Sequence, residues 1–334
     1  METYQKINTI CIFILTIFAT AFVLYLTKTI MIPFVFAIFM YLIISPVMIW
    51  TQQRFSLHKN LALALTVLSL ILTIAIITLL TSSSIDSFLN GAGQYKEKVQ
   101  SAAAFIELRA EHYGIDIKQH NIRGKLQALP IFDFLKNLTA SMLSTFSNMV
   151  LIIIFTLFLL TGESLSSQKI NILEEIKKNI AKYVSTKLFL SIITGTLSYI
   201  IYLIVNLDLA IMFAVLTVFL NFIPNIGSVI AVILPAPVLL LQFGFGWQTL
   251  VVLTSTIIFQ GIIGNILEPK MLGESMDLHP VTILLFLTFW GFIWGVPGMF
   301  LSVPITATLK IIFGKLDITK PIAEIFAGRI QSNE

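Results

Sequence analysis

Long uncharged runs alternate with short polar segments along this chain, and the runs have the length of membrane-spanning helices. Residues 7–26, 30–50 and 61–80 contain no charged side chain. At 1.5 Å per residue, about 20 helical residues cross the ~30 Å hydrocarbon core of a bilayer. The pattern therefore predicts three spans within an N-terminal membrane segment, residues 1–80.

A sizeable polar region follows at residues 81–137, with seven Lys/Arg and six Asp/Glu. Tyr95, Val99, Ala102 and Ile106 recur at helical spacing, which predicts an amphipathic helix. We expect a small extracytoplasmic helical domain here. It is interpreted either as a cap packed on the membrane face or as a lid that gates substrate or docks a partner.

Residues 138–187 predict a fourth span followed by a cytoplasmic interfacial helix. The span covers residues 138–161, and the segment 162–187 carries five lysines and three glutamates. An apolar stripe with lysines around it is typical of a helix that lies flat against anionic headgroups. A fifth span is then expected at residues 188–207.

The next apolar run, residues 209–267, has 59 residues and no charge. It is interrupted by residues that break a continuous spanning helix: Asn221, Pro224, Asn225, Gly227, Pro235 and Pro237. Broken backbone at membrane depth is tolerated where protein buries it or where it lines a wet cavity. We therefore predict full spans at 209–222 and 247–263, with a re-entrant hairpin at 224–243 at the centre of a transport path.

Lys/Arg clusters set the orientation, because cytoplasmic loops are enriched in these residues. Placing all clusters on one side requires an even number of crossings after residue 187. This predicts about eight spans, a hairpin that opens to the cytoplasm, and cytoplasmic termini. The last uncharged run, residues 281–309, is expected to be one tilted, kinked span of a C-terminal core at 188–312, followed by a cytoplasmic tail at 313–334. The predicted helix hinges are Pro235, Pro237, Gly295, Pro297, Gly298 and Pro304.

Composition supports an all-α integral membrane protein. The chain is 57% hydrophobic and 11% charged, with a mean hydropathy of +0.93, whereas soluble domains carry about 25% charged residues. The net charge of +4 is expected to set orientation, so nucleic acid is not an expected partner. The sequence has no HExxH motif, paired membrane aspartates or nucleotide-binding motif, so we expect no enzyme activity, cofactor or metal site.

Ionisable residues inside a membrane are functional candidates, because burying their charge is costly. Asp208 is interpreted as a surface turn residue, and Lys187 as a lysine that extends to the membrane interface. Glu268 is either a solvated loop charge or a functional group that binds a cation or pairs with a buried lysine. His279 is interpreted as a hydrogen-bonded structural residue.

Neutral amides in and beside the broken segment suggest what the path carries. They offer donors and acceptors without charge, which suits a neutral polyol-like solute better than an ion. The predicted path residues are Asn221, Pro224, Asn225, Gly227, Gln260, Asn265, Glu268, Pro269, Lys270, Gly273, His279 and Pro280.

Three motifs resemble the AI-2E family of bacterial transporters, named for autoinducer-2 export. They are NFIPNIGSVIAVILPA at 221–236, GNILEPKMLGESMDLHP at 264–280 and FWGFIWGVPGMFLSVPITATLK at 289–310. The chain departs from the family pattern at Asn225, often Tyr, and at Ser228, often Pro. The resemblance implies a transporter of the bacterial inner membrane that assembles into a ring-like homo-oligomer, with a pentamer as one candidate.

Three functions remain open at this point. The first is export of a small neutral polar solute such as an autoinducer-2-like signalling molecule. The second is sodium(lithium)/proton antiport, which the same resemblance allows. The third is a non-transporting membrane scaffold in which residues 81–137 recruit a partner.

Overall fold

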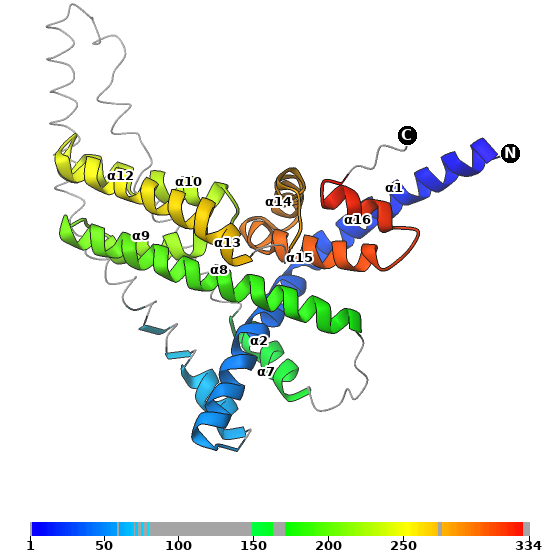
Figure 1. The fold of residues 1–334 in the computed structure, drawn as a ribbon, viewed down its shortest axis with the longest axis horizontal. Coiled ribbons are helices and arrows are strands. Elements are labelled where there is room, and N and C mark those ends of the chain that lie inside the picture. The colour runs from blue at the N-terminus through cyan, green and yellow to red at the C-terminus, as the bar shows by residue number, and fades with distance from the viewer. Residues whose placement is uncertain are drawn as a thin grey trace, which may run out of the picture. The chain divides into compact units, whose positions relative to one another are not determined.

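The computed structural model describes residues 2–58, 60–69, 71–72, 75–76, 79, 149–162, 171–272 and 276–329. Helices dominate these residues, and no strand occurs among them, which confirms the all-α class (Figure 1). The expected helical domain at 81–137, the start of the expected fourth span and Gly273 lie outside the described residues.

Five of the described helical stretches are long and apolar enough to cross a membrane: Lys28–Phe55, Glu174–Ile204, Ile226–Phe243, Trp247–Leu272 and Val296–Gly314. Shorter apolar helices are Asn60–Ser69, Met149–Gly162, Ala210–Leu220 and Pro280–Trp294. Helices satisfy their own backbone hydrogen bonds, as lipid requires. The chain is therefore a multi-pass membrane protein.

The chain divides into two compact units. Unit 1 contains residues 1–62, 147–186 and 272–334, and unit 2 contains residues 63–146 and 187–271. Helix α8, Asn171–Ile204, contributes residues to both. The lysine-rich segment and the expected fifth span form one uninterrupted helix, because no helix-breaking residue lies between them. The two units divide within this helix between residues 186 and 187, next to the predicted boundary.

In unit 1, α2 (Lys28–Phe55) packs against α7 (Met149–Gly162). The rings of Phe34 and Phe155 meet edge to face with centroids 5.7 Å apart. The α2 helix continues through both Pro33 and Pro46. Helix α1, Glu2–Leu26, precedes this pair.

The last apolar run of unit 1 forms two helices, α14 (Pro280–Trp294) and α15 (Val296–Gly314), which pack on each other. This corrects the expectation of a single kinked span. Gly295 makes the turn with φ +67° and ψ −144°, a conformation that is essentially restricted to glycine. Gly298 lets the helices meet, since a Cβ atom there would lie 2.0 Å from the carbonyl oxygen of Trp290.

Ion pairs connect the charged segments of unit 1. Asp277 accepts hydrogen bonds from Lys310 Nζ at 2.7 Å and from Arg329 Nη2 at 3.0 Å. Lys315 Nζ lies 2.8 Å from a carboxylate oxygen of Glu175, near the start of α8. The segment after α15, including α16 (Lys320–Phe326), therefore lies at the same end of unit 1 as the start of α8.

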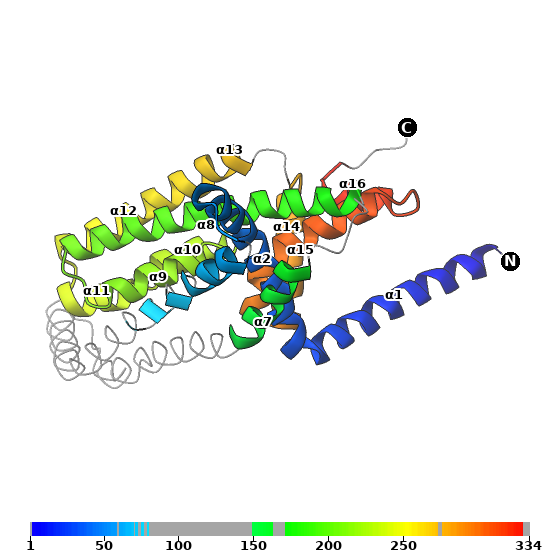
Figure 2. The same ribbon diagram turned by 90° about the horizontal axis from the view of Figure 1, so that it is seen from below.

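Unit 2 is built on the C-terminal part of α8 and the helices that follow it (Figure 2). These are α9 (Ala210–Leu220), α10 (Ile226–Ile233), α11 (Ala236–Phe243), α12 (Trp247–Ile262), the π-helical turn η3 (Ile263–Leu267) and α13 (Glu268–Leu272). A buried apolar cluster from α8, α9, α11 and α12 joins them.

The broken segment does form a hairpin, but not the one that the sequence predicted. The Gln242 side chain donates to the carbonyl of Asn206 at 2.7 Å and accepts from the backbone N–H of Asp208 at 2.9 Å. Asn221, at the other end of α9, donates to Ser191, which lies about four helical turns before Asn206. Helix α9 and the α10–α11 arm are thus the two arms, residues 221–225 are the tip, and the predicted hairpin 224–243 is one arm only.

Two residues explain this shape. Pro235 lacks a backbone N–H and bends the arm, yet its φ of −74° and ψ of −15° keep the backbone helical, so α11 follows α10 directly. At the tip, a Cβ atom on Gly227 would lie 1.7 Å from the carbonyl oxygen of Leu220. Glycine therefore permits the close approach of α9 and α10.

Candidate functional site

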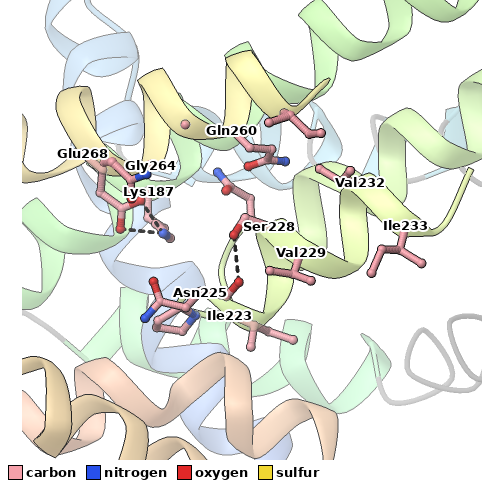
Figure 3. Close-up of a pocket in the computed structure, with 15 residues that line it drawn as sticks. Lys187, Ile223, Asn225, Ser228, Val229, Val232, Ile233, Gln260, Gly264 and Glu268 are labelled. Carbon is pink, nitrogen blue, oxygen red and sulfur yellow. Dashed lines mark hydrogen bonds and ion pairs between the residues drawn. The ribbon is translucent and has the colours of Figure 1, made fainter. Parts of the chain in front are cut away.

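A cavity of about 390 Å³ lies in unit 2 at the tip of the α9–α11 hairpin (Figure 3). Its walls come from α8, the hairpin and the α12–α13 segment. The lining residues are Lys187, Asn221, Ile223, Pro224, Asn225, Ser228, Val229, Val232, Ile233, Ile257, Gln260, Gly261, Gly264, Asn265 and Glu268. The volume suits a small solute rather than a bare ion.

A buried ion pair forms one side of the cavity. Lys187 Nζ lies 2.5 and 2.6 Å from the two carboxylate oxygens of Glu268. The side chains are 3% and 19% exposed, so the pair is largely removed from solvent. Because the charges of Lys187 and Glu268 are opposite and in direct contact, this ion pair adds no net charge to the cavity. Of the interpretations open for Glu268, the structure shows pairing with a buried lysine.

The hairpin tip contains strained backbone at Asn225. This residue has φ +58° and ψ −52°, and the Ile226 N–H donates to the Pro224 carbonyl at 2.6 Å. These features define a γ-turn with positive φ, which is rare and costly. The Ser228 hydroxyl donates to the Asn225 carbonyl at 2.8 Å and supports the turn. Asn225 also lines the cavity, and strained backbone conformations of this kind cluster at functional sites.

Two amides at the cavity differ in their hydrogen bonding. Asn221 Nδ2 donates to Ser191 Oγ at 3.1 Å, which joins the tip to α8. Gln260 is 6% exposed, and neither its amide nitrogen nor its oxygen has a partner within the described part of the chain. An unpaired buried polar group costs about 1–3 kcal/mol. Gln260 therefore presents one donor and one acceptor that a ligand hydroxyl group would satisfy.

The π-helical turn η3 lies where α12 borders the cavity. Gly264 and Asn265 belong to it, and both line the cavity. Such turns are rare and occur frequently at functional sites. Among the described residues, no group of three His, Cys, Asp or Glu side chains could hold a metal ion. The arrangement is suited to hydrogen bonding with a polar solute.

Six of the predicted path residues line the cavity: Asn221, Pro224, Asn225, Gln260, Asn265 and Glu268. Gly227 packs behind the tip, and Pro269 and Lys270 follow Glu268 without lining the cavity. His279 and Pro280 belong to unit 1. There, His279 Nδ1 accepts from the Val281 N–H at 3.3 Å and caps α14, as expected for a structural histidine.

The predicted hinge residues have separate structural roles. Pro235 bends the α10–α11 arm, and Pro237 lies in the first turn of α11. Gly295 makes the α14–α15 turn, Pro297 lies in the first turn of α15, and Pro304 is buried inside α15. Their role in motion stays a prediction.

Asp208 is an exposed turn residue between α8 and α9, as the sequence indicated. Partial burial raises the pKa of its carboxyl group above the ordinary aspartate value. It lies beside Gln242 and not among the residues that line the cavity.

Lys187 is the cavity residue that the sequence interpretation misjudged. The sequence predicts that it extends to the membrane interface, whereas its side chain is buried and paired with Glu268. A signal was present in its spacing: Ser191, Thr194, Ser198 and Tyr202 follow Lys187 at intervals of three or four residues on α8. A polar stripe that begins with a lysine indicates an inward-facing position.

Comparison with known proteins places this geometry in context. The family model "AI-2E family transporter" matches residues 10–317. The AI-2 transport protein TqsA of Escherichia coli K12 is 26% identical over 293 residues, covering 84% of this chain and 85% of that protein. A Haemophilus influenzae protein with a provisional transport-protein name is 27% identical over 307 residues, 86% of each chain. YueF of Bacillus subtilis, named likewise, is 24% identical over 339 residues, 92% of this chain and 89% of that protein.

Proposed function

The chain belongs to the AI-2E transporter family, and we propose that it exports a small neutral polar solute across the bacterial inner membrane. The observation that carries this proposal is the cavity at the hairpin tip, where amides surround an internally neutralised ion pair. The family consists of transport proteins, which supports a transport function for this chain. The lack of enzyme activity stays an expectation from the sequence.

Cavity chemistry supports a solute without net charge. The Lys187 and Glu268 charges neutralise each other, so an ionic solute would have to compete with this contact. Gln260 and the exposed Asn225 and Asn265 offer donors and acceptors together. Hydroxyl groups match both functions of an amide. An autoinducer-2-like molecule is therefore the proposed cargo, in keeping with the name of the Escherichia coli relative.

The proposed orientation places both termini and the cavity opening on the cytoplasmic side. The α9–α11 and α14–α15 hairpins each return the chain to the end where it entered. A hairpin adds two passes, so it does not change whether the total number of membrane crossings is odd or even. The lysine-rich clusters can therefore lie on the same side of the membrane. The Lys315–Glu175 ion pair supports this grouping. The hairpin tip lies about 20 Å along α8 from its C-terminal end, within the depth of a bilayer.

Lipid is the proposed partner of the exposed apolar side chains. Residues such as Leu250, Phe292 and Ile204 are at least 64% exposed, which in water would be unfavourable. The ring-like homo-oligomer, with five subunits as one candidate, stays a prediction from the family resemblance.

A flux measurement with one substitution at the cavity tests the proposal. Purified protein in proteoliposomes would be loaded with labelled autoinducer-2, erythritol or ribose, with proton and sodium gradients imposed separately. Gln260→Leu removes the unpaired amide and should lower efflux of the transported solute at least about tenfold, the equivalent of 1.4 kcal/mol. Gln248→Leu makes the same change on α12 outside the cavity and should retain efflux.

Two results would contradict neutral solute export. One is equal efflux from the Gln260→Leu and wild-type proteins at matched reconstitution. The other is efflux of no neutral solute by wild-type protein that shows sodium-dependent proton movement.

Sodium(lithium)/proton antiport is the second candidate, favoured by the buried Glu268 carboxylate. A carboxylate in a membrane cavity can exchange a proton for a cation once its lysine contact opens. The double variant Lys187→Met/Glu268→Gln removes both charges together. Loss of a sodium-dependent pH change with retained solute efflux would place antiport at this pair.

The scaffold hypothesis has its own test. Deleting residues 95–130 should abolish the role of a scaffold, whereas a transporter would retain flux with altered gating. These residues lie outside the described part of the chain, so the hypothesis stays a prediction from the sequence.

A further inference from the structure

A buried polar stripe leads away from the cavity along α8. Ser191, Thr194, Ser198 and Tyr202 follow Lys187 at intervals of three or four residues, so they share one helix face. All four are 0% exposed. From Lys187 to Tyr202 the stripe covers about 22 Å of helix. It therefore extends from the cavity deep into unit 2.

Two other helices contribute polar groups to the same interior. Helix α9 supplies Thr217, and α12 supplies Thr256, each 1% exposed. The Tyr202 hydroxyl faces the hydroxyls of Ser198, Thr217 and Thr256. We call the six residues Ser191, Thr194, Ser198, Tyr202, Thr217 and Thr256 the hydroxyl seam.

Close helix packing explains only part of this seam. Thr194, Thr217 and Thr256 donate to the carbonyls four residues earlier in their own helices, at 2.7–2.8 Å. Small polar residues with such bonds are common where helices pack in membranes. Those bonds use the donors and leave acceptor lone pairs available on the hydroxyl oxygens.

Polar groups without a standard hydrogen bond on the seam indicate that water or solute molecules occupy it at times. Ser198 Oγ and Tyr202 OH make no hydrogen bond of standard geometry within the described part of the chain, and neither does Gln260 at the cavity end. A buried polar group with no partner, such as the Gln260 amide, costs about 1–3 kcal/mol. The neighbouring hydroxyls reduce this cost for Ser198 and Tyr202. Water or a solute hydroxyl between the helices would satisfy them.

An apolar layer closes the seam at the end away from the cavity. Phe213, Leu239 and Val252 belong to the buried cluster that also contains Tyr202, and they are 0–1% exposed. On α12, Val252 lies between Thr256 on the seam and Thr249, which donates to the Gly244 carbonyl at 2.8 Å. On α12, polar side chains therefore lie on both sides of Val252. The distance along the helix from Thr249 to Thr256 is about 10 Å.

We propose that the hydroxyl seam is the inner part of a translocation path for water and small neutral hydroxyl-bearing solutes, and that Phe213, Leu239 and Val252 are its closed hydrophobic gate. The inference rests on the proposed function and extends it from the cavity to the route of passage. Constrictions lined by apolar side chains exclude water and so close a path without a bulky plug.

The position of Leu239 suggests how the gate opens. Leu239 lies on α11, which follows the bend at Pro235, so movement of α11 about this bend would withdraw one wall of the gate. The Gln242 contacts with Asn206 and Asp208 hold the same helix against the α8–α9 turn. These contacts would have to break on opening.

Water permeability measures the gate without knowledge of the cargo. Full-length protein in liposomes would be exposed to an osmotic step and followed by light scattering. Val252→Thr keeps the side-chain shape and adds a hydroxyl to the gate, so the protein-dependent permeability should rise severalfold. Val251→Thr makes the same change at the preceding residue, which is 40% exposed and outside the gate, and should leave permeability unchanged.

A second substitution tests the seam itself. In the Val252→Thr background, Tyr202→Phe removes the hydroxyl that the seam surrounds and should return water permeability towards the wild-type value. Tyr199→Phe is the matched change on the same helix outside the seam and should have no such effect. Thermal unfolding in detergent would show that all four variants fold.

The outcomes separate this inference from the proposed function. A folded Val252→Thr protein with wild-type permeability overturns the gate, even if Gln260→Leu abolishes solute efflux. Raised permeability that Tyr202→Phe does not change overturns the seam as the route. Failure of every solute assay alongside raised water permeability would refute the proposed cargo and leave the path intact.

Discussion

Two interrupted apolar segments of this protein have similar compositions but different structures. In unit 1, glycine and proline at residues 291–304 produce the α14–α15 hairpin, whose helices meet at Gly298 and Trp290. In unit 2, asparagine, proline and glycine at residues 221–237 produce a hairpin whose tip borders a cavity. Both contain a positive φ at the turn, at Gly295 and at Asn225.

The side chains around each turn account for the difference. The rings of Trp290 and Trp294 are tilted by 46° with centroids 4.9 Å apart, and Trp294 Nε1 donates to the Leu24 carbonyl at 3.0 Å. Aromatic rings thus fill the space beside the unit 1 hairpin, where the Trp290 Nε1–H is a buried donor without a partner among the described residues. Beside the unit 2 tip lie a buried ion pair and an unpaired amide. Helix-breaking residues indicate where a turn forms. The polarity of the surrounding side chains then indicates whether that turn borders a binding site.

Breaking the Lys187–Glu268 ion pair should give the largest change in stability that distinguishes unit 2 from unit 1. Glu268→Gln leaves Lys187 charged, buried and unpaired, which should lower the free energy of unfolding by about 3–5 kcal/mol. Lys187→Met/Glu268→Gln removes both charges and should recover most of that loss. Thermal and denaturant unfolding in detergent would measure both.

The matched change in unit 1 is Lys310→Met, which removes a more exposed partner of Asp277. Its effect should be smaller than that of Glu268→Gln, because water screens an exposed pair. An equal loss of unfolding free energy in both variants would mean that the ion pairs of the two units contribute equally to stability.

The close-packed glycines should give an intermediate effect and separate stability from transport. Gly227→Ala and Gly298→Ala each place a Cβ atom within 2.0 Å of a carbonyl oxygen, so each should cost at least about 1–3 kcal/mol. Only Gly227→Ala displaces the cavity wall. Efflux per folded protein should therefore fall for Gly227→Ala and not for Gly298→Ala.

Gly162→Ala is the control, since nothing lies within 4 Å of a Cβ atom there. It should leave both stability and efflux close to wild type. Equal loss of efflux in the two close-packed variants would contradict the assignment of the site to the unit 2 turn.

The smallest expected effect concerns strain at the two turns. Asn225→Gly relieves a positive φ and should change stability by about 1 kcal/mol or less, with no loss. Efflux should still fall, because the amide at the tip is removed. Gly295→Ala imposes a forbidden conformation and should lower stability without a specific effect on efflux. A destabilised Asn225→Gly protein would show that the amide, and not the strain, holds the tip.

Sequence reasoning located the broken segment because asparagine, proline and glycine are conspicuous in an uncharged run. It identified Asn221, Asn225, Gln260 and Glu268, all of which line the cavity. It could not find the partner of Glu268, because Lys187 lies 81 residues earlier and local spacing carries no information on that contact.

The arrangement of the hairpins was also beyond the sequence argument. Charge bias fixes only whether the number of crossings is odd or even. A hairpin adds two passes wherever it lies, so charge bias fits a hairpin at 224–243 as well as it fits the two hairpins observed. Their positions depend on contacts such as Gln242 with Asn206, which link residues 36 positions apart.

The π-helical turn η3 sets the angular phase of the residues that follow it. In a regular α-helix each residue advances by about 100°, so Glu268, eight residues after Gln260, would lie about 80° away around the axis. A π-helical turn holds about one extra residue and sets the following residues back by roughly that 100°. Glu268 then falls within about 20° of Gln260, on the face that borders the cavity. The π-helical turn thus places the Glu268 carboxylate and the Gln260 amide on the same face of the helix. In an uninterrupted α-helix, Leu267 would occupy the position of Glu268 on that face.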